Sequence, residues 1–158
     1  MAGKKSTLTP LWDRKTVRQF FEKAGQMAGI AIEELLFRTG EEFVKVARQK
    51  GTYQDWTGNL RSSIGYIVAL DGNILGKNFQ LSEKNGTDKQ TGKREAEQMS
   101  SDLALLYNKG YVLVCVSGMK YAAYVEAMDN KDVISLAATE AEAFVRKHSR
   151  LLFKRLQM

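Results

Sequence analysis

The first half of the chain carries apolar side chains at the spacing of an amphipathic helix. From Val17 to Ala47 they recur every three or four residues, which places one apolar stripe along a helix. The pattern therefore predicts a long N-terminal helix. Each internal glycine weakens a helix by about 1 kcal/mol relative to alanine, and Thr39–Gly40 is the expected break. Small residues at positions 24, 25, 28 and 29 fit either close packing within the fold or contact with a second subunit.

The middle of the chain alternates apolar with smaller or polar positions, which is the pattern of strands. Leu60–Leu70 predicts a first strand, and Ile74–Leu81 predicts its partner. Asp71-Gly72-Asn73 lies between them and supplies residues that tolerate the positive φ of a tight hairpin turn. Tyr111–Ser117 reads YVLVCVS, almost entirely apolar or β-branched. We expect it to be a central strand that is buried on both faces.

The remaining segments are polar loops or short helices. Residues 1–15 form a polar leader, and the stretch SEKNGTDKQTGK, residues 82–93, predicts a mobile loop because it has almost nothing to bury. Residues 94–108 place Met99, Leu103 and Leu106 at helical spacing and predict a short helix. From Leu136 to Leu156 a second apolar stripe predicts an amphipathic C-terminal helix.

Together these elements predict a single α+β domain over residues 1–158. Its small, mainly antiparallel sheet is packed by the long N-terminal helix and by the amphipathic C-terminal helix. With 44% hydrophobic and 27% charged residues, the composition suits one ordinary globular core. The leader lacks the apolar run of a signal peptide, and no stretch approaches the length of a membrane helix, so we expect no membrane partner.

The charge pattern contains one concentration of basic residues. The chain has 24 basic and 18 acidic residues, a net charge of +6. The basic residues gather near the end, without an intervening acid, at Arg146, Lys147, Arg150, Lys154 and Arg155. They fit a solvated helix face that complements the negative end of the helix dipole, and they also fit a surface for nucleic acid.

Residues for catalysis or metal binding are few. A zinc site normally uses several His or Cys ligands, whereas Cys115 and His148 are the only residues of their types. Both lie in apolar patterns, which favours core packing over a nucleophilic pair. No two carboxylates stand out as an acid–base couple. We therefore expect neither an enzyme nor a bound cofactor or metal.

Two short motifs stand out. The first is Trp56-Thr57-Gly58-Asn59-Leu60-Arg61-Ser62-Ser63-Ile64, and the second is Lys120-Tyr121-Ala122-Ala123-Tyr124-Val125-Glu126. Turn chemistry and core packing account for both motifs in purely structural terms. Their order along the chain, between two helices, resembles the minor tail-component family of lambdoid tailed phages. The residues that carry the resemblance are Thr57, Gly58, Leu60, Arg61, Ser63, Tyr121, Tyr124, Val125 and Glu126.

The chain departs from that family at three places. Ala123 stands where the family often has proline, Ala127-Met128-Asp129-Asn130 replaces a Phe-Gly-Thr run, and the helix over residues 94–108 resembles an insertion. The resemblance implies a non-enzymatic phage or prophage virion protein that completes the tail or joins it to the head. It further implies self-association into a closed ring, with six copies as the expected number, and docking to connector and tail-tube proteins. The site of action would be the tail or neck of the virion, assembled in the cytoplasm of the bacterial host.

Two other functions stay open. A basic nucleic-acid-binding module would use the C-terminal cluster together with Lys4, Lys5, Arg14, Lys15 and Arg18. A hydrolase built on unrecognised carboxylates is the weaker of the two.

The two motifs also make a structural prediction. Arg61 and Glu126 are each flanked by expected core residues, and we expect them to form an ion pair at one edge of the sheet. The alternative is that both side chains are solvated and independent.

Overall fold

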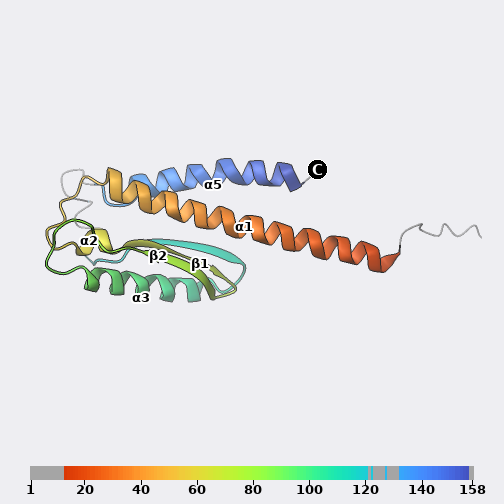
Figure 1. Ribbon diagram of the computed structural model, residues 1–158, viewed down its shortest axis with the longest axis horizontal. Coiled ribbons are helices and arrows are strands. Elements are labelled where there is room, and N and C mark those ends of the chain that lie inside the picture. The colour runs from red at the N-terminus through yellow and green to blue at the C-terminus, as the bar shows by residue number, and fades with distance from the viewer. Residues whose placement is uncertain (1–12, 121, 123–126, 128–131, 157–158) are drawn as a thin grey trace, which may run out of the picture.

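The fold places a three-stranded sheet between two layers of helices. The structure is a computed structural model that describes residues 13–120, 122, 127 and 132–156. Helices α1 (Arg14–Lys50) and α5 (Ser135–Leu156) lie on one side of the sheet, and α3 (Gln90–Leu106) lies on the other (Figure 1). This arrangement confirms the predicted α+β fold with its long N-terminal and amphipathic C-terminal helices.

The sheet is antiparallel and has the order β2-β1-β3. Strand β1 (Ile64–Leu70) pairs with β2 (Asn73–Phe79) on one edge and with β3 (Tyr111–Ser117) on the other. The hairpin turn has φ of 50° at Asp71 and 78° at Gly72, the positive values that a tight turn of this hand requires. The predicted hairpin is therefore confirmed, with a register shift between Val68 and Ala69.

The prediction that Tyr111–Ser117 is the central strand is wrong, because β1 occupies that position. Strand β3 is an edge strand whose faces are nevertheless both covered. Val114 and Val116 are buried on the α3 side, and Leu113 and Cys115 pack against the cluster on the α1 side. Its apolar composition arises because helices cover both of its faces. The same composition does not reveal whether a strand pairs on one edge or on both.

The core has two layers, one on each face of β1. Ile64, Tyr66 and Val68 pack with residues of α1 and α5, whereas Ile67 and Ala69 pack with α3. Successive side chains of a strand point to opposite faces, so a strand buried on both faces lacks polar alternation. The short helix expected over residues 94–108 corresponds to α3, and it covers the second layer of the core.

Helix α1 is continuous, so the expected break at Thr39–Gly40 is wrong. The Thr39 hydroxyl donates to the carbonyl of Leu35 at 2.8 Å, inside the helix. A Cβ on Gly40 would lie 2.5 Å from the ring of Tyr66. Gly40 is therefore required for close approach of helix and sheet, and packing outweighs its low helix propensity.

Several predicted boundaries shift by a few residues. The first strand begins at Ile64, because residues 59–62 form the short helix α2 (Asn59–Ser62). Helix α3 begins at Gln90, so residues 90–93 belong to it, and α1 begins at Arg14, inside the expected leader. Residues 1–12 lie outside the described part of the chain.

The polar segment over residues 82–93 is anchored at several points. Ser82 is 4% exposed, and its amide donates to the Ser62 hydroxyl at 2.8 Å. The Asp88 amide donates to the carbonyl of Thr57 at 3.1 Å, and Gly92 is buried against Asn59. The expectation that the segment has almost nothing to bury is therefore wrong at these residues. Its mobility stays a prediction.

Candidate interaction surfaces

The first motif folds into a capped turn. Gly58 has φ of 82°, a left-handed conformation that suits glycine. The Asp55 carboxylate accepts hydrogen bonds from the amides of Gly58 at 3.0 Å and Arg61 at 2.8 Å, so it caps the start of α2. Sequence reasoning missed Asp55. An aspartate three residues before a glycine is the signal that could have identified it.

Serine hydroxyls tie this turn to its neighbours. The Ser62 hydroxyl donates to the carbonyl of Gly58 at 2.6 Å, and the Ser63 hydroxyl donates to the carbonyl of Leu60 at 2.8 Å. Ser63 Oγ also lies 3.2 Å from Ser117 Oγ at the end of β3. Leu60 is 1% exposed and belongs to the core. Leu60 and Ser63 therefore join α2 to the sheet, whereas Trp56 of the same motif is 83% exposed.

Asn59 connects the turn to the start of α3. Its Nδ2 donates to the Asp88 carboxylate at 3.2 Å, and its Oδ1 accepts the Gly92 amide at 2.7 Å. A Cβ on Gly92 would lie 2.2 Å from the Asn59 carbonyl, so glycine is needed there. The hydrogen bonds to Asp88 hold the pKa of its carboxyl below the ordinary value. No sequence signal relates residues about thirty positions apart.

Arg61 lies against the C-terminal end of α1. Its Nη1 donates to the backbone carbonyl of Arg48, and its guanidinium carbon lies 5.5 Å from the centre of the Tyr53 ring. The predicted partner Glu126 lies outside the described residues, so the ion pair stays a prediction. Within the described chain Arg61 forms no ion pair, and a backbone carbonyl is its closest partner.

Most of the second motif lies outside the described residues. This holds for Tyr121, Ala123, Tyr124, Val125 and Glu126. Ala122 is described: it is 7% exposed, belongs to the core cluster on the α1 side, and donates its amide to the carbonyl of Met119 at 2.9 Å.

The first part of α1 extends beyond the rest of the fold. We call residues 14–30 the arm. The start of β3 reaches α1 at Gly29, where Tyr111 Oη lies 3.1 Å from the position of a Cβ, and the helix continues past the sheet and past α5 (Figure 1). The large apolar side chains of the arm are exposed: Phe20 by 68%, Phe21 by 67%, Met27 by 58% and Ile30 by 68%. The arm therefore carries large apolar side chains that nothing in the described chain covers.

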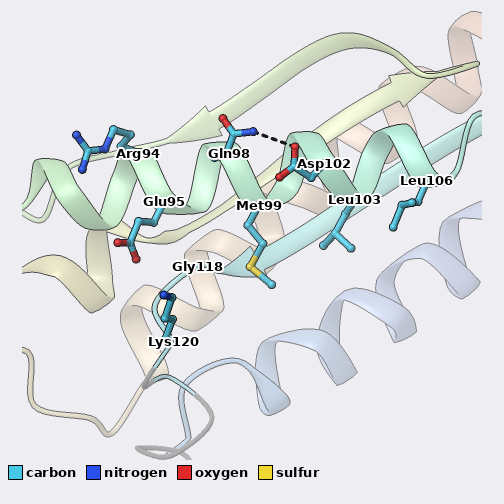
Figure 2. Close-up of a pocket in the computed structure, with 9 residues that line it drawn as sticks. All are labelled: Arg94, Glu95, Gln98, Met99, Asp102, Leu103, Leu106, Gly118 and Lys120. Atoms are coloured by element: carbon cyan, nitrogen blue, oxygen red, sulfur yellow. Dashed lines mark hydrogen bonds between the residues drawn. The ribbon is translucent and has the colours of Figure 1, made fainter.

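A groove of about 700 Å³ lies between α3 and the end of β3. It is lined by Arg94, Glu95, Gln98, Met99, Asp102, Leu103, Leu106, Gly118 and Lys120 (Figure 2). Met99 and Leu106 are 46% and 75% exposed, and Asp102 accepts a hydrogen bond from Gln98 at 2.9 Å. Edge strands and apolar grooves are surfaces that second chains commonly cover.

The basic cluster of α5 is only partly neutralised. Arg146 pairs with Glu142 at 2.6 Å, four residues earlier on the same exposed face. Lys147, Arg150 and Lys154 are exposed and form no ion pair within the described residues. Arg155 lines a cavity of about 460 Å³ between α1 and α5. The cluster is therefore split between an open face and this cavity.

Cys115 and His148 both occupy partly buried positions. Burial raises the pKa of the Cys115 thiol to about 12, so the thiol stays protonated at neutral pH. His148 Nδ1 lies 2.8 Å from the carbonyl of Phe144, and its ring stacks on that of Phe144 at 4.0 Å. These surroundings match the packing roles expected from the sequence.

In the described part of the chain, no three His, Cys, Asp or Glu residues are grouped so that they could hold a metal ion. Over the same residues, no helix combines the length and the hydropathy that crossing a bilayer requires. Comparison of the chain with protein-family models, with curated proteins and with solved structures gives no match.

Proposed function

We propose that this chain is a phage or prophage virion structural protein that completes the tail or joins it to the head. The observation that carries the proposal is the arm, which presents four exposed large apolar side chains on a helix outside the core. The motif residues Thr57, Gly58, Leu60, Arg61 and Ser63 support it by resemblance. In this role the chain acts as a structural subunit, with no catalytic step.

The arm favours self-association on energetic grounds. The arm continues from the packed half of α1 without packing of its own, and Gly25 and Gly29 lower its helix propensity. Covering Phe20, Phe21, Met27 and Ile30 removes apolar surface from water, at roughly 25 cal/mol per Å². Association with another protein surface therefore stabilises the arm.

A closed ring requires two different surfaces on each subunit, because its contacts are heterologous. The arm and the groove beside β3 are two such surfaces, one convex and one concave. We propose a ring, with six copies as the expected number, that docks to connector and tail-tube proteins in the tail or neck. Assembly would take place in the cytoplasm of the bacterial host.

The test is the mass of the assembly at concentrations used for virion reconstitution. Wild-type chain should sediment as a closed oligomer, and the double variant Phe20→Ser with Phe21→Ser should sediment as the 17.8 kDa monomer. The matched control is Trp56→Ser, which removes an aromatic side chain of 83% exposure that belongs to neither the arm nor the groove and should leave the oligomer intact. A wild-type chain that stays monomeric, alone and with purified connector and tail-tube proteins, would overturn the proposal.

Binding of nucleic acid is the second candidate function. Lys147, Arg150 and Lys154 recur at a spacing that places them on one exposed face of α5, and none has an ion-pair partner in the described chain. Each phosphate that they contact adds about 0.9 to the slope of log affinity against log salt. A duplex-binding assay over a range of salt concentrations should give a slope near three if all three residues bind phosphate. Negligible binding at low salt would exclude this candidate.

A further inference from the structure

Two arginine side chains meet beside the C-terminal end of α1. Arg48 donates from Nη1 to the carbonyl of Gln80 at 3.2 Å and from Nη2 to the carbonyl of Leu81 at 3.0 Å. Arg61 donates from Nη1 to the backbone carbonyl of Arg48. Neutral oxygens therefore orient both guanidinium groups. Neither group has a carboxylate in an ion pair within the described residues.

One donor of this arginine pair has no acceptor. Arg61 Nε is buried and makes no hydrogen bond within the described chain. A buried donor without an acceptor costs free energy, most of all on a charged group. The pKa of Arg48 is lowered by burial and, to a smaller extent, by the charge of Arg61. The carboxylate of Glu83 raises the pKa of Arg48, but by less than burial and the charge of Arg61 lower it.

The two arginines line a polar cavity of about 320 Å³. Lys45 and Lys84 add two further cations to its wall, and Glu41 and Glu83 add two carboxylates. Glu41 already accepts hydrogen bonds from Tyr66 Oη at 2.7 Å and Asn78 Nδ2 at 2.8 Å. Lys45 also lies 3.4 Å from Glu42 on the same helix. Four cations against two carboxylates leave the wall positive.

We propose that this cavity binds a small oxyanion of the phosphate class between Arg48 and Arg61. A guanidinium group presents several N–H donors in a fixed fork that matches the oxygens of phosphate. Arg48 and Arg61 both line the cavity, and neither guanidinium group has a carboxylate in an ion pair within the described residues. Free inorganic phosphate and a phosphate of nucleic acid present the same oxygens to this site, so both fit its chemistry. The site does not depend on the proposed virion role.

Helix capping is the competing explanation for the same two arginines. The C-terminal carbonyls of α1 carry the negative end of the helix dipole, and cations stabilise them. Under capping alone, replacing Arg61 lowers stability equally with and without phosphate. An anion site makes part of that stability depend on phosphate, since a bound anion stabilises the folded state.

The experiment measures binding of inorganic phosphate by calorimetry at constant ionic strength, with chloride as the reference anion. Wild-type chain should bind millimolar phosphate saturably, and Arg48→Gln and Arg61→Gln should each weaken binding at least tenfold. The control Arg146→Gln removes an exposed, ion-paired arginine of α5 and should leave phosphate affinity unchanged. Lys84 lies on an exposed loop of the cavity wall, and Lys84→Ala should weaken phosphate binding severalfold. This variant keeps the test decisive if Arg61→Gln fails to fold.

A second readout addresses the geometry directly. The Nε–H resonance of Arg61 in a nitrogen-15 spectrum should shift on addition of phosphate and not on addition of chloride. Competition between inorganic phosphate and a short DNA duplex then identifies the source of the anion. Absence of saturable phosphate binding to wild-type chain, or equal loss in Arg146→Gln, would overturn the proposal. Loss of ring assembly with phosphate binding intact would overturn the proposed virion role alone.

Discussion

The two halves of α1 share one apolar periodicity and have opposite surroundings. In the C-terminal half Phe43 is 1% exposed and the ring of Tyr66 packs against Gly40. In the arm Phe20 is 68% exposed, and Gly25 has nothing within 4 Å of the position of a Cβ. Periodicity therefore predicts which face of a helix is apolar, whereas the neighbours of the helix decide whether that face is covered.

The largest expected difference between the halves comes from removing a phenyl ring. Phe43→Ala should lower the free energy of unfolding by about 3 to 5 kcal/mol, because it opens a cavity in the core. Phe20→Ala should change it by less than about 0.5 kcal/mol in the monomer. Urea unfolding of both variants at a concentration that keeps the chain monomeric makes the comparison. Similar losses for the two variants would show that the arm is buried in the isolated chain.

Replacing a glycine by alanine should change stability in opposite directions in the two halves of α1. Gly40→Ala should destabilise by about 1 to 3 kcal/mol, because its Cβ would lie 2.5 Å from the Tyr66 ring. Gly25→Ala should stabilise by about 0.5 to 1 kcal/mol, because alanine is the better helix former and the site is open. Thermal or urea unfolding of the two variants measures both values. Destabilisation by Gly25→Ala would instead indicate a close neighbour along the arm.

The smallest expected effect is a pH dependence from the covered region. Burial raises the pKa of Cys115, which packs on the α1 side of the sheet, to about 12 from its ordinary value of 9.0. Above pH 9 the unfolded chain loses this proton before the folded chain does, so stability should fall as pH rises towards 12. In the Cys115→Ser variant, the free energy of unfolding should fall by about 1 kcal/mol less over this pH range than in the wild-type chain. Unfolding of both chains at pH 8 and at about pH 9.7 provides the measurement, and an unchanged slope would contradict the assignment.

Local sequence signals predicted those parts of the candidate surfaces that depend on near neighbours. Thr57 and Gly58 marked a turn, and Gly58 adopts the positive φ that the turn needs. The contacts of Asn59 with Asp88 and Gly92 were not predictable, because they join segments about thirty residues apart. The contact between Arg61 and Arg48 has the same origin: it depends on where α1 ends relative to α2.

The arm shows the same division between pattern and context. Its apolar stripe and its small residues were visible in the sequence, and both core packing and subunit contact were compatible with them. The structure leaves the stripe exposed: Tyr111 at the start of β3 meets α1 at Gly29, Gly25 is open, and the helix continues past the sheet and past α5 (Figure 1). The proposed self-association depends on this exposure.

By itself, the sequence determined the helices, the hairpin and the α+β class, because each follows from periodicity and turn chemistry over a few residues. Only the tertiary structure decided that β1 lies in the centre, that Gly40 serves packing without breaking α1, and that Arg48 and Arg61 share a cavity. Each of these outcomes depends on contacts between residues distant in the chain. Local propensities of about 1 kcal/mol per residue are outweighed by the burial of whole side chains in such contacts.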